Sequence, residues 1–292
     1  MQHNETRSAG GPAPAASGLS GLLSSNVYLA FKYAIYLALI GNVFLFLREE
    51  YGAAQHLFVD QVPIGQLINA FAASIDTAAW VLLLLLFELE TYQIPDERLT
   101  PPLLAAFLGF RGLCYLVIGY AFFGYLSKAL AFTASPAAVS DACALVEAGR
   151  SLMIDLDEFQ PLTTANCGTV QKPLRFVQGN VIVDLEVFRA CLRLAWTDVV
   201  NSGAWLLVVG ALEAEVWLQL RGRLTGWIYS SINLLQLLLY LVLFAAAVYW
   251  GIAGDFLDFW DACLWLLAFF IIEMNVFQWR EETRDGAGPV LA

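Results

Sequence analysis

Carboxylate side chains recur at one fixed distance from a tryptophan in three apolar stretches of the 292-residue chain. The shared pattern is Asp or Asn, three residues, Trp, seven residues, Glu, one residue, and then Glu or Asn. The three copies contain Asp76, Trp80, Glu88 and Glu90; Asn201, Trp205, Glu213 and Glu215; and Asp261, Trp265, Glu273 and Asn275. Carboxylates inside a membrane are costly and commonly mark a path for cations or protons. The pattern therefore provides the first candidate functional residues.

A weaker pattern precedes each copy. A long polar residue, which is Lys32, Arg111 or Gln236, is followed four positions later by Tyr-Leu. Recurrence at fixed spacing is typical of duplicated architecture, and internal repeats are common in membrane transport proteins. The alternation predicts three tandem helical hairpins that run in the same direction, each with an outward first helix and a returning second helix.

Membrane helices must position these residues. The chain is 59% hydrophobic and 14% charged, whereas a soluble domain carries about 25% charged residues. Several apolar runs reach the ~20 residues that span a bilayer. The sequence predicts an all-α integral membrane protein with six transmembrane helices, near residues 27–47, 67–93, 102–132, 196–220, 226–252 and 256–279.

The remaining segments divide the chain into regions. Residues 1–26 and 280–292 are expected to be disordered tails, the first because Gly, Pro and small residues dominate it. Residues 27–133 hold the first three helices, and residues 196–279 hold the last three. The insertion at 134–195 is the one long polar segment. Its apolar positions and turn signals predict a small folded cap, and a loosely ordered loop is the alternative.

Two features of the insertion indicate local structure. The stretch "LRFVQGNVIVDL" predicts a β-hairpin that turns at Gly179–Asn180. Cys143 and Cys167 are the preferred disulfide pair, because Cys191 is close enough to the next helix to belong to it. The spacing of the cysteines also permits other pairings.

The placement of Lys and Arg predicts the orientation in the membrane. With the N-terminus inside, more of the basic residues near helix ends are cytoplasmic than extracytoplasmic. Both termini are then cytoplasmic and the insertion is extracytoplasmic, where a disulfide persists. Compact loops favour a plasma membrane of the bacterial inner type.

Two interpretations of the repeated charges remain open. In the structural one, Lys32–Glu88 and Arg111–Glu213 are ion pairs that fix the register of neighbouring helices. In the functional one, a surplus carboxylate belongs to a cation or proton path. Glu273 is then the first candidate, because its own repeat supplies no cation as its mate.

Asp76, Asp261, Glu90, Glu215 and Gln236 are secondary candidates. Glu90 and Glu215 lie about 200° around the helix from the first carboxylates, so they need not share a site with them. Asp76 and Asp261 lie in the outer halves of their helices, where they either stabilise helix N-termini or line an outer vestibule for cations. Gln236 is suited to hydrogen bonds between helices.

Composition argues against several functions. The net charge of −11 argues against nucleic acid as a partner. Two histidines and no Cys-x-x-Cys pair argue against a zinc site, and no cofactor is expected. No catalytic motif is present, so an enzyme is the least favoured class. Asn42 is expected only to bond between helices, and His56 to be solvated in the first outer loop.

The sequence therefore predicts a multi-pass membrane protein that handles a cation or proton through the carboxylates of its even-numbered helices. The alternative is a non-catalytic scaffold or accessory subunit, in which the charges are structural ion pairs. Its partners would be the lipid bilayer, a protein that binds the insertion, or further copies of the chain.

Overall fold

The computed structural model describes residues 25–58, 70–90, 94, 100–134, 138–139, 141–170, 173–177 and 181–270. The chain divides into two compact units, Met1–Leu37 with Leu267–Ala292, and Ala38–Leu266. Apart from Ser25 and Asn26, the predicted tails lie outside the described residues. Most of the candidate residues belong to the second unit.

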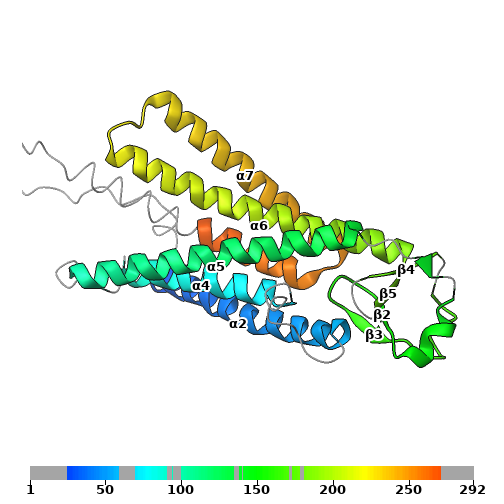
Figure 1. Cartoon of the computed structure of the whole chain (residues 1–292). Coiled ribbons are helices and arrows are strands. Elements are labelled where there is room, and N and C mark those ends of the chain that lie inside the picture. Colours follow the sequence, from blue (N-terminus) through cyan, green and yellow to red (C-terminus); the bar gives the residue numbers. More distant parts are fainter. Residues whose placement is uncertain are drawn as a thin grey trace, which may run out of the picture. The chain divides into compact units, whose positions relative to one another are not determined.

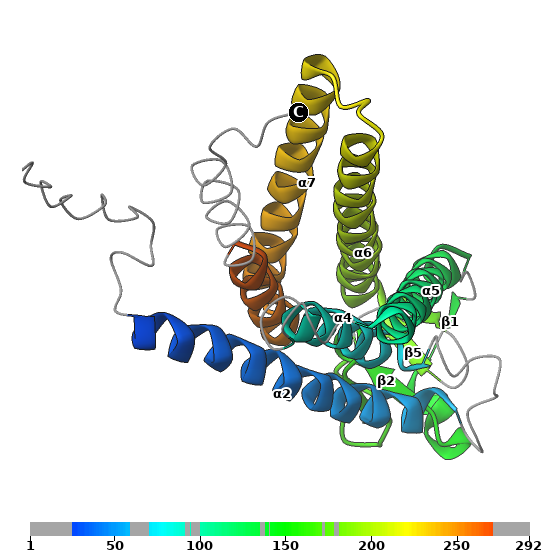
Figure 2. The same cartoon turned by 90° about the vertical axis from the view of Figure 1, so that its left-hand side faces the viewer.

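Helices make up most of the described chain (Figure 1). They are α2 (Ser25–Leu57), α4 (Ala72–Glu88), α5 (Pro101–Ala134), α6 (Leu185–Leu220), α7 (Gly226–Ala253) and a further helix at residues 256–270. Within the second unit α4 packs on α5, α5 on α6, and α6 on α7. In Figure 1 the α6–α7 hairpin opens toward its connecting turn, and Figure 2 views the two helices from the side on which that turn lies.

Four of the described helices are long and apolar enough to cross a membrane. They comprise Val27–Leu57, Pro101–Thr133, Leu185–Gln219 and Gly226–Ala253. The chain is thus a mostly helical, multi-pass membrane protein. The helix α4 has only 17 residues, and the last helix is described only to Phe270. For these two helices, membrane crossing stays a prediction.

Two predicted helix boundaries are wrong. The first predicted helix continues past residue 47 to Leu57, and the fourth begins at Leu185 instead of residue 196. Asp184 starts α6, because its side chain accepts hydrogen bonds from the N–H groups of Glu186 and Val187, both at 2.9 Å. At ~1.5 Å per residue the helix is about 54 Å long, so it extends well beyond a ~30 Å hydrocarbon layer.

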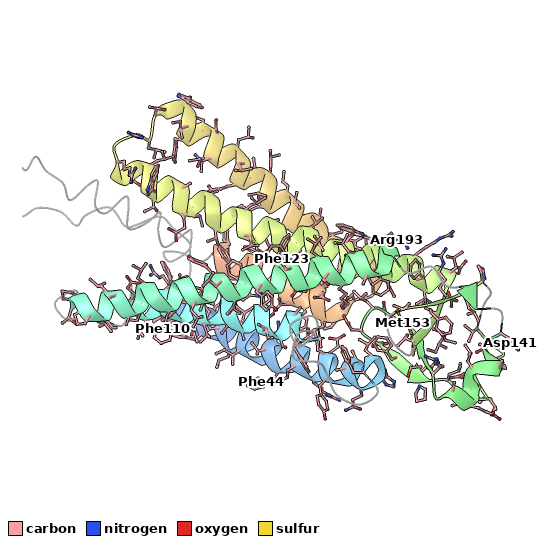
Figure 3. The ribbon with its side chains drawn as sticks, in the orientation of Figure 1. Phe44, Phe110, Phe123, Asp141, Met153 and Arg193 are labelled. Carbon is pink, nitrogen blue, oxygen red and sulfur yellow. A yellow bond between two sulfur atoms is a disulfide. The ribbon has the colours of Figure 1, made fainter. Side chains whose placement is uncertain are left out.

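The outward faces of the helices are apolar. Phe44 of α2 and Phe110 and Phe123 of α5 are 66%, 58% and 62% exposed (Figure 3). Exposed phenylalanine along a helix would be unfavourable in water but is the ordinary surface of a helix in lipid. By contrast, the polar side chains of Asn42, Asp76 and Ser202 are buried.

The insertion folds as a small mixed sheet, here called the cap (residues 138–184). Its strands are β1 (Ala138–Val139), β2 (Ser151–Met153), β3 (Phe159–Pro161), β4 (Leu174–Phe176) and β5 (Val181–Asp184), in the order β1-β4-β5-β2-β3. Strands β4 and β5 pair antiparallel, which confirms the predicted hairpin. Its turn at Gly179–Asn180 lies outside the described residues.

Alternation along β5 gives the cap two apolar faces. Val181 and Val183 pack with residues of α5, α6 and α7, whereas Ile182 points into a separate core within the cap. Successive side chains of a strand point to opposite faces, so one short strand serves both clusters. The first cluster fixes the cap to the ends of these helices.

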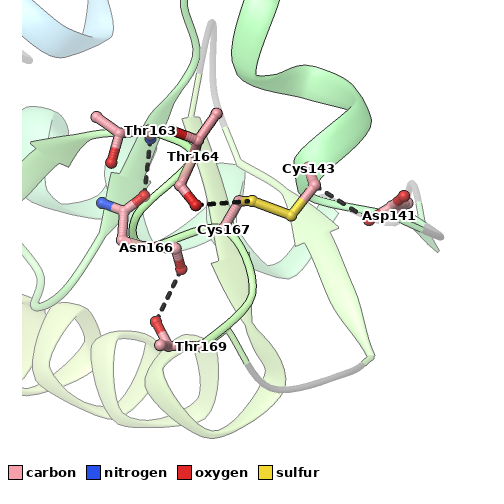
Figure 4. Close-up of a disulfide and its surroundings, with 7 residues drawn as sticks. All are labelled: Asp141, Cys143, Thr163, Thr164, Asn166, Cys167 and Thr169. Atoms are coloured by element: carbon pink, nitrogen blue, oxygen red, sulfur yellow. Dashed lines mark hydrogen bonds between the residues drawn. A yellow bond between two sulfur atoms is a disulfide. The ribbon is translucent and has the colours of Figure 1, made fainter.

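A disulfide joins Cys143 and Cys167, the preferred pair (Figure 4). Cys167 also belongs to the core of the cap, beside Leu162 and Leu174. Cys191 is a free, buried cysteine inside α6. The disulfide therefore links the short helix at Cys143–Ala148 to the apolar core of the sheet.

His56 is not solvated in a loop, contrary to the prediction. It lies in the last turn of α2, and its Nδ1 is 2.9 Å from the Ser151 hydroxyl of β2. Its ring stacks on Phe159 of β3, with the centroids 5.8 Å apart. The extension of α2 past residue 47 brings His56 to the cap.

Candidate functional site

The charges that were predicted to pair are arranged differently. Arg111 of α5 forms its ion pair with Glu90, not with Glu213. Glu213 is exposed on α6 and accepts a hydrogen bond from the Tyr115 hydroxyl at 3.1 Å. The helices α4 and α5 pack on each other, which brings Glu90 to Arg111. The predicted pair Arg111–Glu213 is therefore wrong, and Glu90, a secondary candidate, is the partner of Arg111.

The pair Lys32–Glu88 stays a prediction, because its members belong to different units. Lys32 is 3% exposed, and its ammonium lies 6.0 and 5.7 Å from the ring centres of Tyr33 and Tyr36. Glu273, the first carrier candidate, lies outside the described residues, as does Asn275.

Three further candidates, Glu88, Glu215 and Gln236, have buried side-chain groups. Glu88 and Glu215 are each 6% exposed. The side-chain Nε2 of Gln236 is buried and has no hydrogen-bond partner among the described residues. Burial of Glu215 argues that it is not simply a solvated helix-end residue.

The three repeated tryptophans meet. Trp80 of α4 lies 6.2 Å from Trp205 of α6 and 6.2 Å from Trp265 of the 256–270 helix, measured between ring centres. Trp205 and Trp265 are each 7% exposed. The tryptophans at this position of the pattern thus belong to three different helices but lie close together. They are here called the tryptophan layer. Aromatic pairs at such distances attract each other beyond their simple burial.

The Asp/Asn positions of the pattern form a second layer. Asp76, Asn201 and Asp261 each lie four residues before a member of the tryptophan layer, which is one helical turn toward the cap on the same face. Asp76 is 9% exposed, and it lies close enough to Asp261 to interact electrostatically. Asp76 and Asp261 also interact with the indoles of Trp80 and Trp265. These three polar residues are here called the polar layer.

Side chains from α2 and α5 contact the polar layer. The Asn42 amide donates a hydrogen bond to Asp261 Oδ1 at 2.7 Å. The Tyr125 hydroxyl donates to Asp76 Oδ2 at 3.5 Å. The role expected for Asn42, a bond between helices, is confirmed, but its partner places it in the candidate site. Tyr125 was not found from the sequence, because it has no equivalent in the repeated pattern.

One face of α6 extends the site. Asp198 and Ser202 flank Asn201 at i, i+3 and i+4 spacing, and Trp205 continues the same side of the helix. Ser202 is 4% exposed. Asp198 was also missed from the sequence, although its spacing to Asn201 and Trp205 is a helical signal.

A cluster of acids lies between the polar layer and the cap. Glu50 of α2 accepts hydrogen bonds from the N–H groups of Ala73 and Ser74, at 2.7 and 3.0 Å, and from the Ser74 hydroxyl at 2.6 Å. It therefore caps the positive N-terminus of α4. In the turn after α7, burial raises the pKa of Asp255, and the nearby charge of Asp157 adds to that rise.

Lys128 of α5 supplies positive charge to this cluster. Its ammonium lies 2.7 and 2.9 Å from the two carboxylate oxygens of Asp157 in the cap. It is also near Asp198. The pair joins the cap to a membrane helix, with side chains only 24% and 28% exposed.

Replacing Lys128 by methionine is expected to lower the free energy of unfolding by about 2 kcal/mol. Breaking a fully buried pair costs about 3–5 kcal/mol, and partial exposure reduces that cost here. Unfolding in detergent, followed by circular dichroism, measures the loss. Arg221→Met is the control, because Arg221 is exposed and packs only over the Trp217 ring at 4.0 Å. Equal losses in both variants would contradict the prediction.

The site is rich in oxygen but does not resemble a transition-metal centre. In the part of the chain that the structure describes, no three His, Cys, Asp or Glu side chains are placed to hold a metal ion. Its charged residues are divided between the polar layer and the acid cluster.

Comparisons with known proteins give no relative. No family model, no curated protein and no solved structure matches the chain. The function must therefore be argued from the site.

Proposed function

We propose that the protein carries a monovalent cation or a proton across the membrane through the polar layer. The observation that carries the proposal is the approach of two carboxylates, the buried Asp76 and the half-buried Asp261, from two helices into one layer. Two like charges in a water-poor site repel each other, and a bound proton or cation relieves that repulsion. Acids in such places within membrane proteins commonly belong to ion pathways.

The contrast with the Arg111–Glu90 pair supports this choice of site. A charge that only sets helix register is expected to meet an opposite charge, as Arg111 does with Glu90. Asp76 and Asp261 instead meet neutral groups, the hydroxyl of Tyr125 and the amide of Asn42. The path is therefore assigned to the Asp layer nearer the cap, and not to the Glu positions of the pattern.

The proposal includes the orientation and the repeat. The cap is extracytoplasmic and both termini are cytoplasmic, in a plasma membrane of the bacterial inner type. The disulfide Cys143–Cys167 supports this side for the cap, because disulfides persist in oxidising compartments. The chain is built from three tandem hairpins, and the meeting of Trp80, Trp205 and Trp265 supports that arrangement.

Ion flux into liposomes tests the function. Asp76→Asn is expected to reduce proton or monovalent-cation flux at least about tenfold, equivalent to ~1.4 kcal/mol in the barrier, because the amide cannot carry the charge that attracts the ion. Glu147→Gln in the cap is the matched control, since Glu147 is an exposed carboxylate far along the chain from the layer. Wild-type flux no greater than that of empty liposomes would refute the proposal.

Glu213→Gln distinguishes a path through the polar layer from a path through the Glu positions of the pattern. If the path uses the polar layer, this exchange leaves flux nearly unchanged, because Glu213 is exposed and bonded to Tyr115. Flux lost in Glu213→Gln but kept in Asp76→Asn would return the path to the Glu positions.

A second candidate is an accessory subunit that binds a partner protein through the cap. The observation that favours it is a folded, disulfide-linked sheet with an exposed apolar residue, Ile154, which is 47% exposed. The experiment is purification in mild detergent after cross-linking. The same partner should be recovered from wild type and lost in Ile154→Glu, and recovery in both would contradict a docking role for this residue.

A further inference from the structure

Four buried oxygen atoms near the polar layer have no hydrogen-bond partner among the described residues. They are Asp76 Oδ1, Asp198 Oδ1, Asn201 Oδ1 and Ser202 Oγ. Buried polar groups are nearly always paired, because an unpaired one destabilises the folded state. Several such atoms on neighbouring elements indicate that something else satisfies them.

Three of these oxygens lie on one face of α6. Asp198, Asn201 and Ser202 have i, i+3 and i+4 spacing, so they are neighbours on the helix surface. Trp205 continues that side of α6 and contacts Trp80 of α4. The face is therefore turned toward the helix that carries Asp76.

Tyr125 connects the two sides. Its hydroxyl is 3.5 Å from Asp76 Oδ2, and it lies close enough to Asp198 to interact electrostatically. Carboxylates of α4 and α6 are thus both near this tyrosine. The unpaired atoms of the set are acceptors or, for Ser202, a hydroxyl that can accept.

The chemistry of this set favours a cation over a proton alone. A proton can satisfy a carboxylate oxygen, but it does not bind the amide oxygen of Asn201 at ordinary pH. Oxygen donors from carboxylate, amide and hydroxyl groups are those that hard cations prefer.

The charge of the set favours a monovalent ion. Only two of the four donors are carboxylates, whereas calcium sites collect 6–8 oxygens, several of them charged. Around the set, the positive charge of Lys128 near Asp198 is accompanied by the negative charges of Asp157 and Asp255, so the small number of donors is what favours the monovalent ion. Both carboxylates are approached by an indole, but of the two Asp198 also lies near a cation, Lys128. Asp76, Asn201 and Ser202 are therefore the principal donors.

We propose that a dehydrated monovalent cation of the sodium class binds between α4 and α6, on the oxygens of Asp76, Asn201 and Ser202, with Asp198 beside them. This inference rests on the proposed function and names the ion that the polar layer carries. Binding to the folded state alone raises the unfolding temperature, whether or not the ion is transported.

Thermal unfolding of the purified full-length protein in detergent tests the site. The protein is titrated with NaCl, KCl, CaCl₂ or N-methylglucamine chloride at constant ionic strength. We expect Na⁺ to raise the unfolding temperature by several degrees in a saturable manner, with N-methylglucamine giving no shift. Ser202→Ala is expected to raise the half-saturating Na⁺ concentration about tenfold, which corresponds to ~1.4 kcal/mol for one lost ligand.

Ser231→Ala is the matched control. Ser231 is exposed on α7 and its hydroxyl donates to the Trp227 carbonyl of its own helix at 2.9 Å. Its half-saturating Na⁺ concentration should equal that of wild type. Because Ser202→Ala removes only one hydroxyl, its Na⁺ titration tests the site even where Asp76→Asn is too unstable to purify.

The outcomes separate this inference from the transport proposal. Saturable Na⁺ binding that weakens in Ser202→Ala supports the site, even where liposomes show no flux and transport fails. Equal stabilisation by all salts would overturn it, and the unpaired oxygens would then hold water. Saturable stabilisation by Ca²⁺ and not by Na⁺ would overturn the monovalent class. An unchanged Na⁺ titration in Ser202→Ala would overturn the location.

Discussion

Replacement of Trp80 by alanine is expected to lower the free energy of unfolding by about 3 kcal/mol. Trp80 is the one ring of the tryptophan layer for which contacts to both others are seen, at 6.2 Å each. Removing it leaves a cavity between α4, α6 and the 256–270 helix. The value is at the low end of the ~3–5 kcal/mol for Trp→Ala in soluble cores, because lipid lowers the cost of exposing apolar surface.

Unfolding by denaturing detergent in mixed micelles measures this loss. Trp227→Ala is the control, since Trp227 lies at the start of α7 and is 73% exposed. That exchange should change stability by less than about 0.5 kcal/mol, as for other surface positions. A comparable loss in the two variants would show that the tryptophan layer does not hold the three helices together.

Removing the disulfide by the double exchange Cys143→Ser and Cys167→Ser is expected to destabilise the cap by about 3 kcal/mol. The bond closes a loop with a sequence separation of 24, and the loss of that constraint gives the unfolded cap more conformational freedom. The small apolar core around Leu174 and Ile182 has few other means of offsetting this entropy.

Amide hydrogen exchange resolves where the loss falls. Protection of β2, β4 and β5 should drop about a hundredfold, since 1.4 kcal/mol corresponds to tenfold. Protection within α7 should remain. Cys114→Ala in α5 is the control, because it removes a free cysteine and leaves the disulfide intact. Unchanged exchange of the cap strands in the double variant would contradict the prediction.

Several features of the protein follow from local sequence. Long apolar runs determine the membrane class, since lipid requires helices whose backbone groups are internally bonded. The hairpin of β4 and β5 follows from alternating apolar residues on either side of turn residues. The recurring Trp position also follows from spacing alone, and it identified Trp80, Trp205 and Trp265 before their contacts were known.

Tertiary packing decided which charges meet. Glu88 and Glu90 are two residues apart and therefore lie on nearly opposite sides of the helix. The sequence alone does not show on which of these sides the neighbouring helix packs. The packing of α4 on α5 selected Glu90 as the partner of Arg111. Packing likewise brought Asn42 to Asp261 across 219 positions of sequence and Tyr125 to Asp76. Asn42 and Tyr125 lie at positions outside the repeated patterns, so only their arrangement in space reveals them.

Local capping and tertiary contact together set the helix ends. The polar residues after position 47 favoured a loop, yet α2 continues because Glu50 caps α4 and His56 meets the cap. The sequence by itself thus determined a membrane protein with repeated carboxylates and a disulfide-linked cap. The tertiary structure alone decided that Asp76 and Asp261 approach each other and meet neutral partners, because burial and pairing depend on neighbours from distant segments.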